Sequence, residues 1–176
     1  MECCSNVVQY SALSYCAVSW LRTMTAQQDQ QKESFELFYS NNTIYSNFYP
    51  AKFTDPRLKF PEGSVHHGVE DFSFVHVEQY MHACKALLFK DNERLDQILA
   101  ATDPLETKNL GRQVAGFEDE VWCSLARDIV TRGCWLKFSQ NRDLWDQMET
   151  TEKRTFVECA PRDRRQVAND CYFSIW

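Results

Sequence analysis

Long apolar runs are missing from this sequence, and no stretch approaches the roughly 20 apolar residues of a membrane-spanning helix. An excess of positive charge is also missing, since 19 Lys and Arg residues stand against 25 Asp and Glu residues. The formal net charge is −6, whereas proteins that coat nucleic acid are basic, so any nucleic-acid contact must be local. The leader "VVQYSALSYCAVSWL" has an apolar core, but Glu2 precedes it and no Lys or Arg does, so it lacks the charged start of a signal peptide. We therefore expect a cytoplasmic protein with no membrane contact.

Cysteines in the C-x-x-C spacing of metal sites are absent, although the chain contains eight cysteines. No CxxC occurs, and Cys84, Cys123 and Cys134 lie among apolar residues of predicted helices. This spacing favours free buried thiols over a set of disulfides. A zinc site takes paired Cys or His ligands. Because that pattern is missing, we expect no metal site and no cofactor.

The overall composition is that of a globular protein. The 176 residues are 44% hydrophobic and 14% aromatic, enough for one domain with a core of its own. Residues 22–34, "RTMTAQQDQQKES", are polar and Gln-rich and are typical of a linker. We expect an N-terminal extension and linker over residues 1–34 and a domain that opens at Phe35.

The apolar pattern predicts an α+β fold, a mostly helical single domain with a few short strands. "FELFYS" alternates and predicts a strand, and "TFVECA", residues 155–160, predicts another. From Phe74 onward the period is helical, and we expect helices over residues 74–90, 92–101 and 118–140 and a short one in "NRDLWDQMETT". In "DPLE", Asp103 is placed to cap a helix that starts at Pro104. Trp122 and Trp135 are expected in the core.

One predicted helix carries two charges on nearly the same line. Glu78 and Lys85 are separated by about 20° around the helix axis and by about 10 Å along it, too far for an ordinary i,i+4 ion pair. Apolar surroundings would raise the pKa of the carboxylate and lower that of the lysine. Such shifts favour proton transfer and amine nucleophilicity near neutral pH. His82 lies between them and can pair with either.

Three further segments offer candidate binding groups. In "SNFYP", Ser46 and Asn47 stand beside Phe48, which suits a planar ring with polar edges or an ordinary turn. In "LGRQV", Arg112 is a phosphate ligand or a surface arginine. In "VECAPRD", Glu158 ends a predicted strand and Asp163 follows in a loop. These two carboxylates belong to a site or stabilise the loop.

The ordered set of these motifs resembles the NADAR family, the YbiA-like N-glycosidases. "SNFYP", "VEQYMHACKALLF", "LGRQV", Trp122, "LKFSQN" and "VECAPRD" follow in the family's order over residues 35–163. The resemblance implies a NADAR/YbiA-like fold and hydrolysis of N-glycosidic bonds, with no metal or other cofactor. It places the family's catalytic positions on Glu78, Lys85 and Asp163. The candidate substrate-binding residues are Ser46, Asn47, Phe48, His82, Arg112, Trp122 and Glu158.

The implied substrates are phosphorylated riboflavin-pathway intermediates or ADP-ribose attached to guanine. The partners are then a small nucleotide or ADP-ribosylated guanine in nucleic acid. Breaking the C1–N bond develops positive charge at C1 and negative charge on the leaving nitrogen. A carboxylate can stabilise the first or activate water, and an acid can protonate the second. A lysine offers another route, a Schiff base with the opened sugar.

The resemblance stops after Asp163. The family continues with a Trp-Gly-x-Gly turn and a terminal helix, whereas this chain continues with "RRQVANDCYFSIW" and has Gln166 at the Trp position. We therefore expect a divergent, poorly packed tail over residues 164–176 and a chain that is a weak catalyst or none. The alternatives are an inactive module that binds ADP-ribose or a related nucleotide, and a degenerate product with a scaffold role only.

Overall fold

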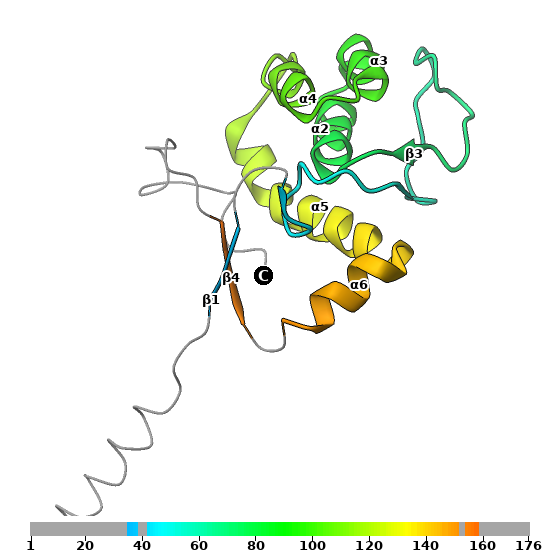
Figure 1. The fold of residues 1–176 in the computed structure, drawn as a ribbon. Helices are drawn as coiled ribbons and strands as arrows, with labels where there is room; N and C mark the ends of the chain where they lie inside the picture. Colours follow the sequence, from blue (N-terminus) through cyan, green and yellow to red (C-terminus); the bar gives the residue numbers. More distant parts are fainter. Residues whose placement is uncertain (1–34, 39–41, 152–153, 159–176) are drawn as a thin grey trace, which may run out of the picture. The chain divides into compact units, whose positions relative to one another are not determined.

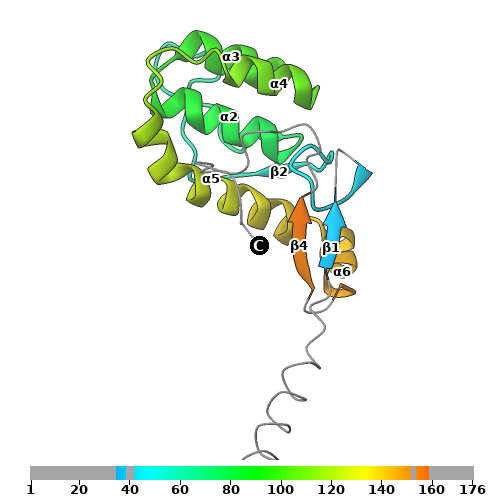
Figure 2. The ribbon, with the colours of Figure 1, turned by 90° about the vertical axis from the view of Figure 1, so that its left-hand side faces the viewer.

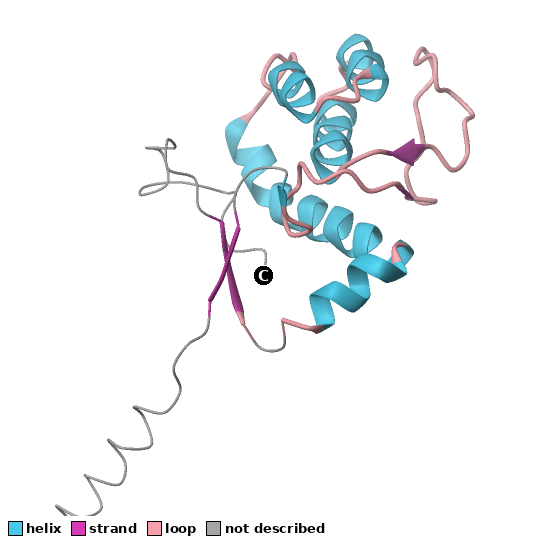
Figure 3. Ribbon diagram, in the orientation of Figure 1, coloured by secondary structure: helices cyan, strands magenta, loops and turns pink. Residues whose placement is uncertain are grey.

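The computed structural model describes residues 35–38, 42–151 and 154–158, which lie in one compact unit. The predicted extension over residues 1–34, Asp163 and the tail over residues 164–176 lie outside the described residues. The fold is α+β and mostly helical, as predicted (Figures 1 and 3). Its elements are β1 (Phe35–Phe38), β2 (Phe53–Thr54), β3 (Ser73–Phe74), α2 (Val77–Leu88), α3 (Asn92–Ala100), α4 (Pro104–Gly111), α5 (Asp119–Gln140), α6 (Arg142–Glu149) and β4 (Thr155–Glu158).

Helix α2 lies between the α3–α4 pair and α5 and contacts all three (Figures 1 and 2). Ten consecutive residues, from Val77 to Ala86, are buried. The buried surface extends around α2 because neighbouring helices cover it on more than one side. Glu78 and Lys85 are therefore inside the domain.

Two polar side chains at the start of α2 fasten it to the end of α3. His76 caps α2, with Nδ1 accepting from the Gln79 N–H at 3.0 Å and Nε2 donating to the Thr102 carbonyl at 3.3 Å. Burial lowers the pKa of His76, which agrees with a neutral ring in this tautomer. The Gln79 amide nitrogen lies 2.8–3.2 Å from three carbonyls that end α3, those of Ile98, Leu99 and Ala101.

Several observed helix boundaries differ from the predicted ones by one to three residues. Phe74 is in β3, paired with Phe53 and buried, so α2 starts at Val77 and not at residue 74. After α2, Lys90 has a left-handed φ of 58°, which ends the helix before α3 begins. Glu118 is the residue before α5, so that helix starts one position later than expected.

The predicted start of α4 is confirmed. The Asp103 carboxylate accepts from the backbone N–H groups of Leu105 at 3.4 Å and Glu106 at 3.2 Å, and Pro104 opens the helix. These bonds satisfy two of the N–H groups that a helix start leaves without an intrahelical partner.

Replacing Asp103 with alanine is expected to lower the free energy of unfolding by about 1 kcal/mol, because both capping bonds are lost. Urea unfolding at neutral pH measures the change. Asp103→Asn keeps an oxygen at the same place and should retain most of the stability. Equal losses in the two variants would show that the cap is not what Asp103 contributes.

Among the described residues, two small sheets and two apolar clusters complete the fold. β1 and β4 pair in parallel, with Phe35 opposite Thr155, and β2 and β3 pair antiparallel. The larger cluster surrounds α2, and the smaller one packs β1 and the 44–51 segment against α5 and α6. Trp135 was expected in the core, but it is 57% exposed because it lies on the outer face of α5.

The described cysteines follow the prediction in part. Cys84 and Cys134 are free and buried, and burial raises the pKa of each thiol to about 12. Cys123 is half-buried and disulfide-bonded, so the expectation of a free thiol is wrong at that position. Among the helices of the described ranges, none is both long and apolar enough to cross a membrane.

Candidate active site

Glu78 and His82 form a buried pair on α2. Each residue is 4% exposed, and His82 Nε2 lies 3.0 Å from Glu78 Oε1. The spacing is i,i+4, which places the two side chains on the same side of the helix. No hydrogen-bond partner for His82 Nδ1 occurs among the described residues. The pairing is therefore that of a ring carrying its hydrogen on Nε2 and donating to the carboxylate.

Lys85 extends the same line of α2 by another turn. Its Nζ donates to the Gly111 carbonyl at 3.0 Å, lies 4.0 Å from the centre of the Phe117 ring and 5.5 Å from that of Trp122. Burial lowers the pKa of Lys85, and the nearby Asp119 carboxylate opposes this shift. The neutral amine is therefore populated at lower pH than for a solvated lysine. Trp122 is in the core, as predicted, and also beside this amine.

The predicted binding loop meets α2 next to Glu78. The Asn47 carbonyl accepts from the Glu78 N–H at 3.1 Å, which satisfies one N–H group at the start of the helix. Within the loop, the Ser46 hydroxyl accepts from the Phe48 N–H at 3.1 Å. Lys108 of α4 places Nζ 5.6 Å from the centre of the Phe48 ring. The loop therefore lies between the start of α2 and α4.

Lys137 of α5 holds the same loop, and the sequence did not single it out. The side chain is 1% exposed, and Nζ donates to the carbonyls of Ile44 at 2.6 Å and Ser46 at 2.9 Å. Burial lowers the pKa of Lys137 to about 8. One turn earlier, the Cys134 thiol donates to the Asn47 side-chain oxygen at 3.5 Å. The loop is thus bound from α5 as well as from α2.

Lys137 yields a prediction on stability and pH. Its pKa is about 8 in the folded chain and about 10.4 in an unfolded one, so between these values the unfolded state binds more protons. Folding stability from this group therefore rises with pH across that window and is lost as pH falls toward 8. We expect the stability difference between wild type and Lys137→Met to be about 1–3 kcal/mol larger at pH 10 than at pH 8.

Urea unfolding at several pH values between 8 and 10 measures this difference. The exposed Lys52 offers a matched control, since Lys52→Met removes a lysine without a buried partner. A wild-type minus Lys137→Met difference that is constant across the range would contradict the assignment.

The other predicted site residues stand apart from this group or outside the described side chains. Arg112 directly follows α4 and is exposed. Glu158 is in β4, but its side chain is not described, and Asp163 is outside the described residues. Glu78, His82, Asn47 and Phe48 are brought together around the start of α2, and Lys85 lies further along the same helix.

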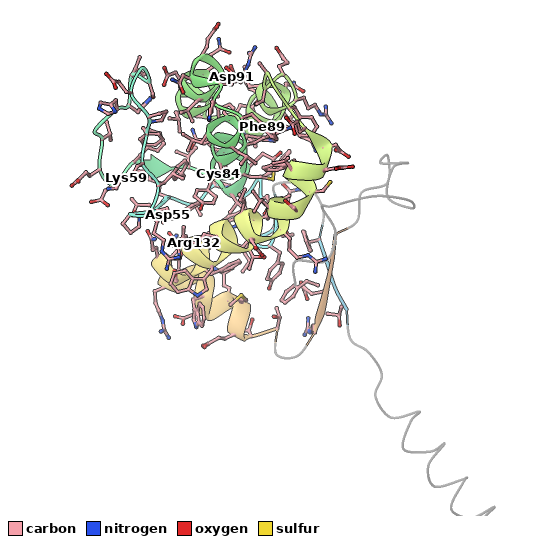
Figure 4. All side chains as sticks on the ribbon, turned by 180° about the vertical axis from the view of Figure 1, so that it is seen from behind. Asp55, Lys59, Cys84, Phe89, Asp91 and Arg132 are labelled. Carbon is pink, nitrogen blue, oxygen red and sulfur yellow. The ribbon has the colours of Figure 1, made fainter. Side chains whose placement is uncertain are left out.

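A second buried polar cluster, which the sequence did not predict, involves the opposite side of α2. Asp55 is 6% exposed and accepts from the Tyr80 hydroxyl at 2.8 Å and from Arg132 Nη2 at 2.8 Å and Nε at 3.2 Å. Burial alone would raise the pKa of Asp55, but the hydrogen bonds from Arg132 and Tyr80 lower it overall. Figure 4 shows Asp55 and Arg132 side by side. This cluster links the loop after β2 to α2 and α5.

In the part of the chain that is described, His, Cys, Asp and Glu side chains form no group of three able to hold a metal ion. The buried groups on α2 offer proton transfer by the Glu78–His82 pair and an amine, that of Lys85, that can act as a nucleophile.

Comparison with known proteins gives one family and several relatives. The sequence profile of the NADAR domain matches residues 34–165. N-glycosidase R617 of Acanthamoeba polyphaga mimivirus is 37% identical over 121 residues, which are 69% of this chain and 66% of that protein. Protein irg-1 of Caenorhabditis elegans is 30% identical over 146 residues, which are 82% of this chain and 69% of that protein. The chain thus spans slightly less than two thirds of the mimivirus protein.

Among solved structures, the NMR structure of the Escherichia coli protein YbiA is similar. The TM-score is 0.56 at 20% sequence identity, over 74% of this chain and 70% of that one. At this identity the likeness establishes the fold alone.

Proposed function

The chain belongs to the NADAR domain family, and on that premise we propose that it is an N-glycosidase, a hydrolase of a sugar C1–N bond. The similar mimivirus protein is named an N-glycosidase, which supports the general reaction type. The proposal for this chain rests on its own residues as well, because fold similarity alone does not establish activity.

The observation that carries the proposal is the buried line of ionisable groups on α2. Glu78, His82 and Lys85 share one side of the helix, and each is at most 6% exposed. Acidic and basic side chains are rarely buried without a partner or a function. The sequence resemblance aligns the same Glu and Lys with catalytic positions of the family.

The proposed reaction uses the Lys85 amine as nucleophile. Once the ribose ring has opened, the C1–N bond to the base is replaced by a C1–N bond to Lys85, and the base leaves with a proton. Water then hydrolyses the imine, which releases the sugar and restores the amine. The Glu78 carboxylate stabilises positive charge at C1 and transfers the protons, with His82 holding its orientation. Asp163 is proposed as a second carboxylate of the site.

The proposed substrates are phosphorylated ribosyl intermediates of the riboflavin pathway or ADP-ribose attached to guanine. The Phe48 ring of the binding loop is half-buried, offers an aromatic surface for a base, and has Lys108 beside it. Ser46, Asn47, Arg112, Trp122 and Glu158 are proposed as further binding residues. No cofactor is part of the proposal, and the reaction is proposed to occur in the cytoplasm.

The test is base release from both substrate classes by the full chain, followed by liquid chromatography with mass detection. Glu78→Gln should lower the rate by about 10²-fold or more, the size of effect found for positioned proton-transfer groups. The exposed Glu120 provides the matched control, and Glu120→Gln should retain the wild-type rate. Release that both variants retain would contradict the proposal.

The divergent tail gives the assay a second comparison. We propose that the chain is a weak catalyst, because Gln166 replaces a Trp that the family resemblance leads us to expect. A variant with Trp-Gly-x-Gly and a terminal helix after Asp163 should then release base faster than the chain as it stands. If ADP-ribose raises the melting temperature of the chain while no base is released, the binding module is the correct alternative.

A further inference from the structure

Gly111, the last residue of α4, contacts two members of the polar line on α2, His82 and Lys85. Its carbonyl oxygen accepts from Lys85 Nζ at 3.0 Å. Its Cα faces the His82 ring so closely that a Cβ built at this position would overlap Nδ1, Cγ and Cε1 of the imidazole. Gly111 is buried, and its φ lies outside the left-handed region, so the backbone does not itself require glycine there. The requirement is the space that the His82 ring occupies.

The contact with Gly111 fixes the ring of His82 from the side opposite to Glu78. Nδ1 faces Gly111 and has no hydrogen-bond partner among the described residues, while Nε2 bonds Glu78. A hydrogen on Nδ1 would be buried without an acceptor, which is unfavourable. The ring is therefore held as the tautomer that presents Nε2–H to the carboxylate.

We propose that Gly111 is a positioning residue for both reacting groups of the site. It fixes the orientation of the Glu78 carboxylate through the ring of His82, and it fixes the position of the Lys85 amine through its own carbonyl oxygen. A single backbone position then fixes the two groups relative to each other across two turns of α2. The proposal rests on the proposed function for the roles of Glu78 and Lys85, but the geometry that it describes does not depend on which reaction the chain performs.

The test is a cycle of four chains: wild type, Gly111→Ala, His82→Ala and the double variant. In Gly111→Ala the added methyl group pushes the imidazole away from Glu78 and shifts the carbonyl from Lys85. In the double variant the ring is gone, so the methyl group has room. We expect Gly111→Ala alone to lower the melting temperature markedly, and the double variant to melt close to His82→Ala. This non-additivity is the signature of a direct contact.

Nuclear magnetic resonance separates positioning from general destabilisation. The ¹⁵N spectrum of the histidine rings reports the His82 tautomer, and the ε-methylene signal of Lys85 reports its surroundings. Both should change in Gly111→Ala, whereas the Lys85 signal should return toward its wild-type position in the double variant. If Gly111→Ala does not fold, the double variant and His82→Ala still give the comparison of melting temperatures and of Lys85 signals.

Gly133 of α5 provides the matched control. A Cβ there would meet Tyr80 Cδ1 at 2.8 Å and Val77 Cγ1 at 3.1 Å, again against α2 but away from the polar line. Gly133→Ala should lower the melting temperature and leave the His82 and Lys85 signals in place. Base release per folded molecule should fall about 100-fold in Gly111→Ala, the size expected for a displacement near 1 Å, and should stay near wild type in Gly133→Ala.

Two outcomes would overturn the proposal. One is a Gly111→Ala chain with unchanged His82 and Lys85 signals. The other is a double variant whose loss in melting temperature equals the sum of the two single losses. If the wild type releases no base from any substrate tested, the proposed function fails, while the melting and resonance measurements still decide the role of Gly111.

Discussion

Base release is expected to fall by about 10²–10⁴-fold when Lys85 is replaced with methionine. Methionine is similar in length and apolar, so it fills the space beside Phe117 and Trp122 but lacks the amine that forms the imine. The melting temperature should change little or rise, because a buried amine is replaced by a thioether. A loss of rate in a stable chain therefore reports the amine and not the packing.

Two further measurements define the role of Lys85. Sodium borohydride added during turnover should reduce the imine and leave the sugar attached at Lys85, which peptide mass spectrometry detects. Because burial lowers the pKa of Lys85, the rate should rise with pH through a limb below the ordinary lysine value of about 10.4. Lys52→Met is the control, since Lys52 is exposed. Full activity of Lys85→Met would rule out the imine route.

Replacing Arg132 with methionine is expected to lower the free energy of unfolding by about 3–5 kcal/mol. The variant leaves the Asp55 carboxylate buried, with Tyr80 and a backbone N–H but without its charged partner. Arg142→Met is the control, because Arg142 forms an i,i+4 pair with Asp146 on the surface, where its side chain is 80% exposed. Such a pair contributes about 0.3–0.5 kcal/mol.

The cost of Arg132→Met should depend on pH in a defined direction. The hydrogen bonds around Asp55 lower its pKa in the folded chain despite its burial. A carboxyl whose folded pKa is lowered contributes stability above its unfolded pKa of about 3.9 and loses it as pH falls through the folded value. The stability difference between wild type and Arg132→Met, measured by urea unfolding, should therefore be largest near pH 7 and shrink below pH 4. A difference that grows on acidification would contradict this account of Asp55.

The sequence predicted those features that depend on local chemistry. The Asp103–Pro104 start of α4 is set by one side chain and two nearby N–H groups, and it was placed correctly. The helical spacing of Glu78 and Lys85 also predicted that both lie on one line of α2. Their burial did not follow from this spacing, because it depends on α3, α4 and α5, which come later in the chain.

Long-range contacts explain what the sequence did not predict. Lys137 reaches the carbonyls of Ile44 and Ser46, more than 90 positions earlier. A signal was present, since Lys137 follows Val130 and Cys134 at i,i+7 and i,i+3, on what proves to be a buried face. A lysine on an apolar face is ordinarily assigned to the rim, where its stem is buried and its amine solvated. Asp55, Tyr80 and Arg132 come from three distant segments, and no local pattern joins them.

The pairing of β1 with β4 has a consequence for the order of events during synthesis. Residues 35–38 leave the ribosome long before residues 155–158, and at about 5–20 residues per second the interval is several seconds or more. Throughout it, the "FELF" strand lacks its β4 partner, and the smaller apolar cluster lacks Phe156, whose ring centre lies 4.6 Å from that of Tyr45. Pairing two strands that are 120 positions apart closes a long loop, and such non-local contacts are intrinsically slow to form. The nascent chain therefore exposes the unpaired edge of an apolar strand until residues 155–158 have been made.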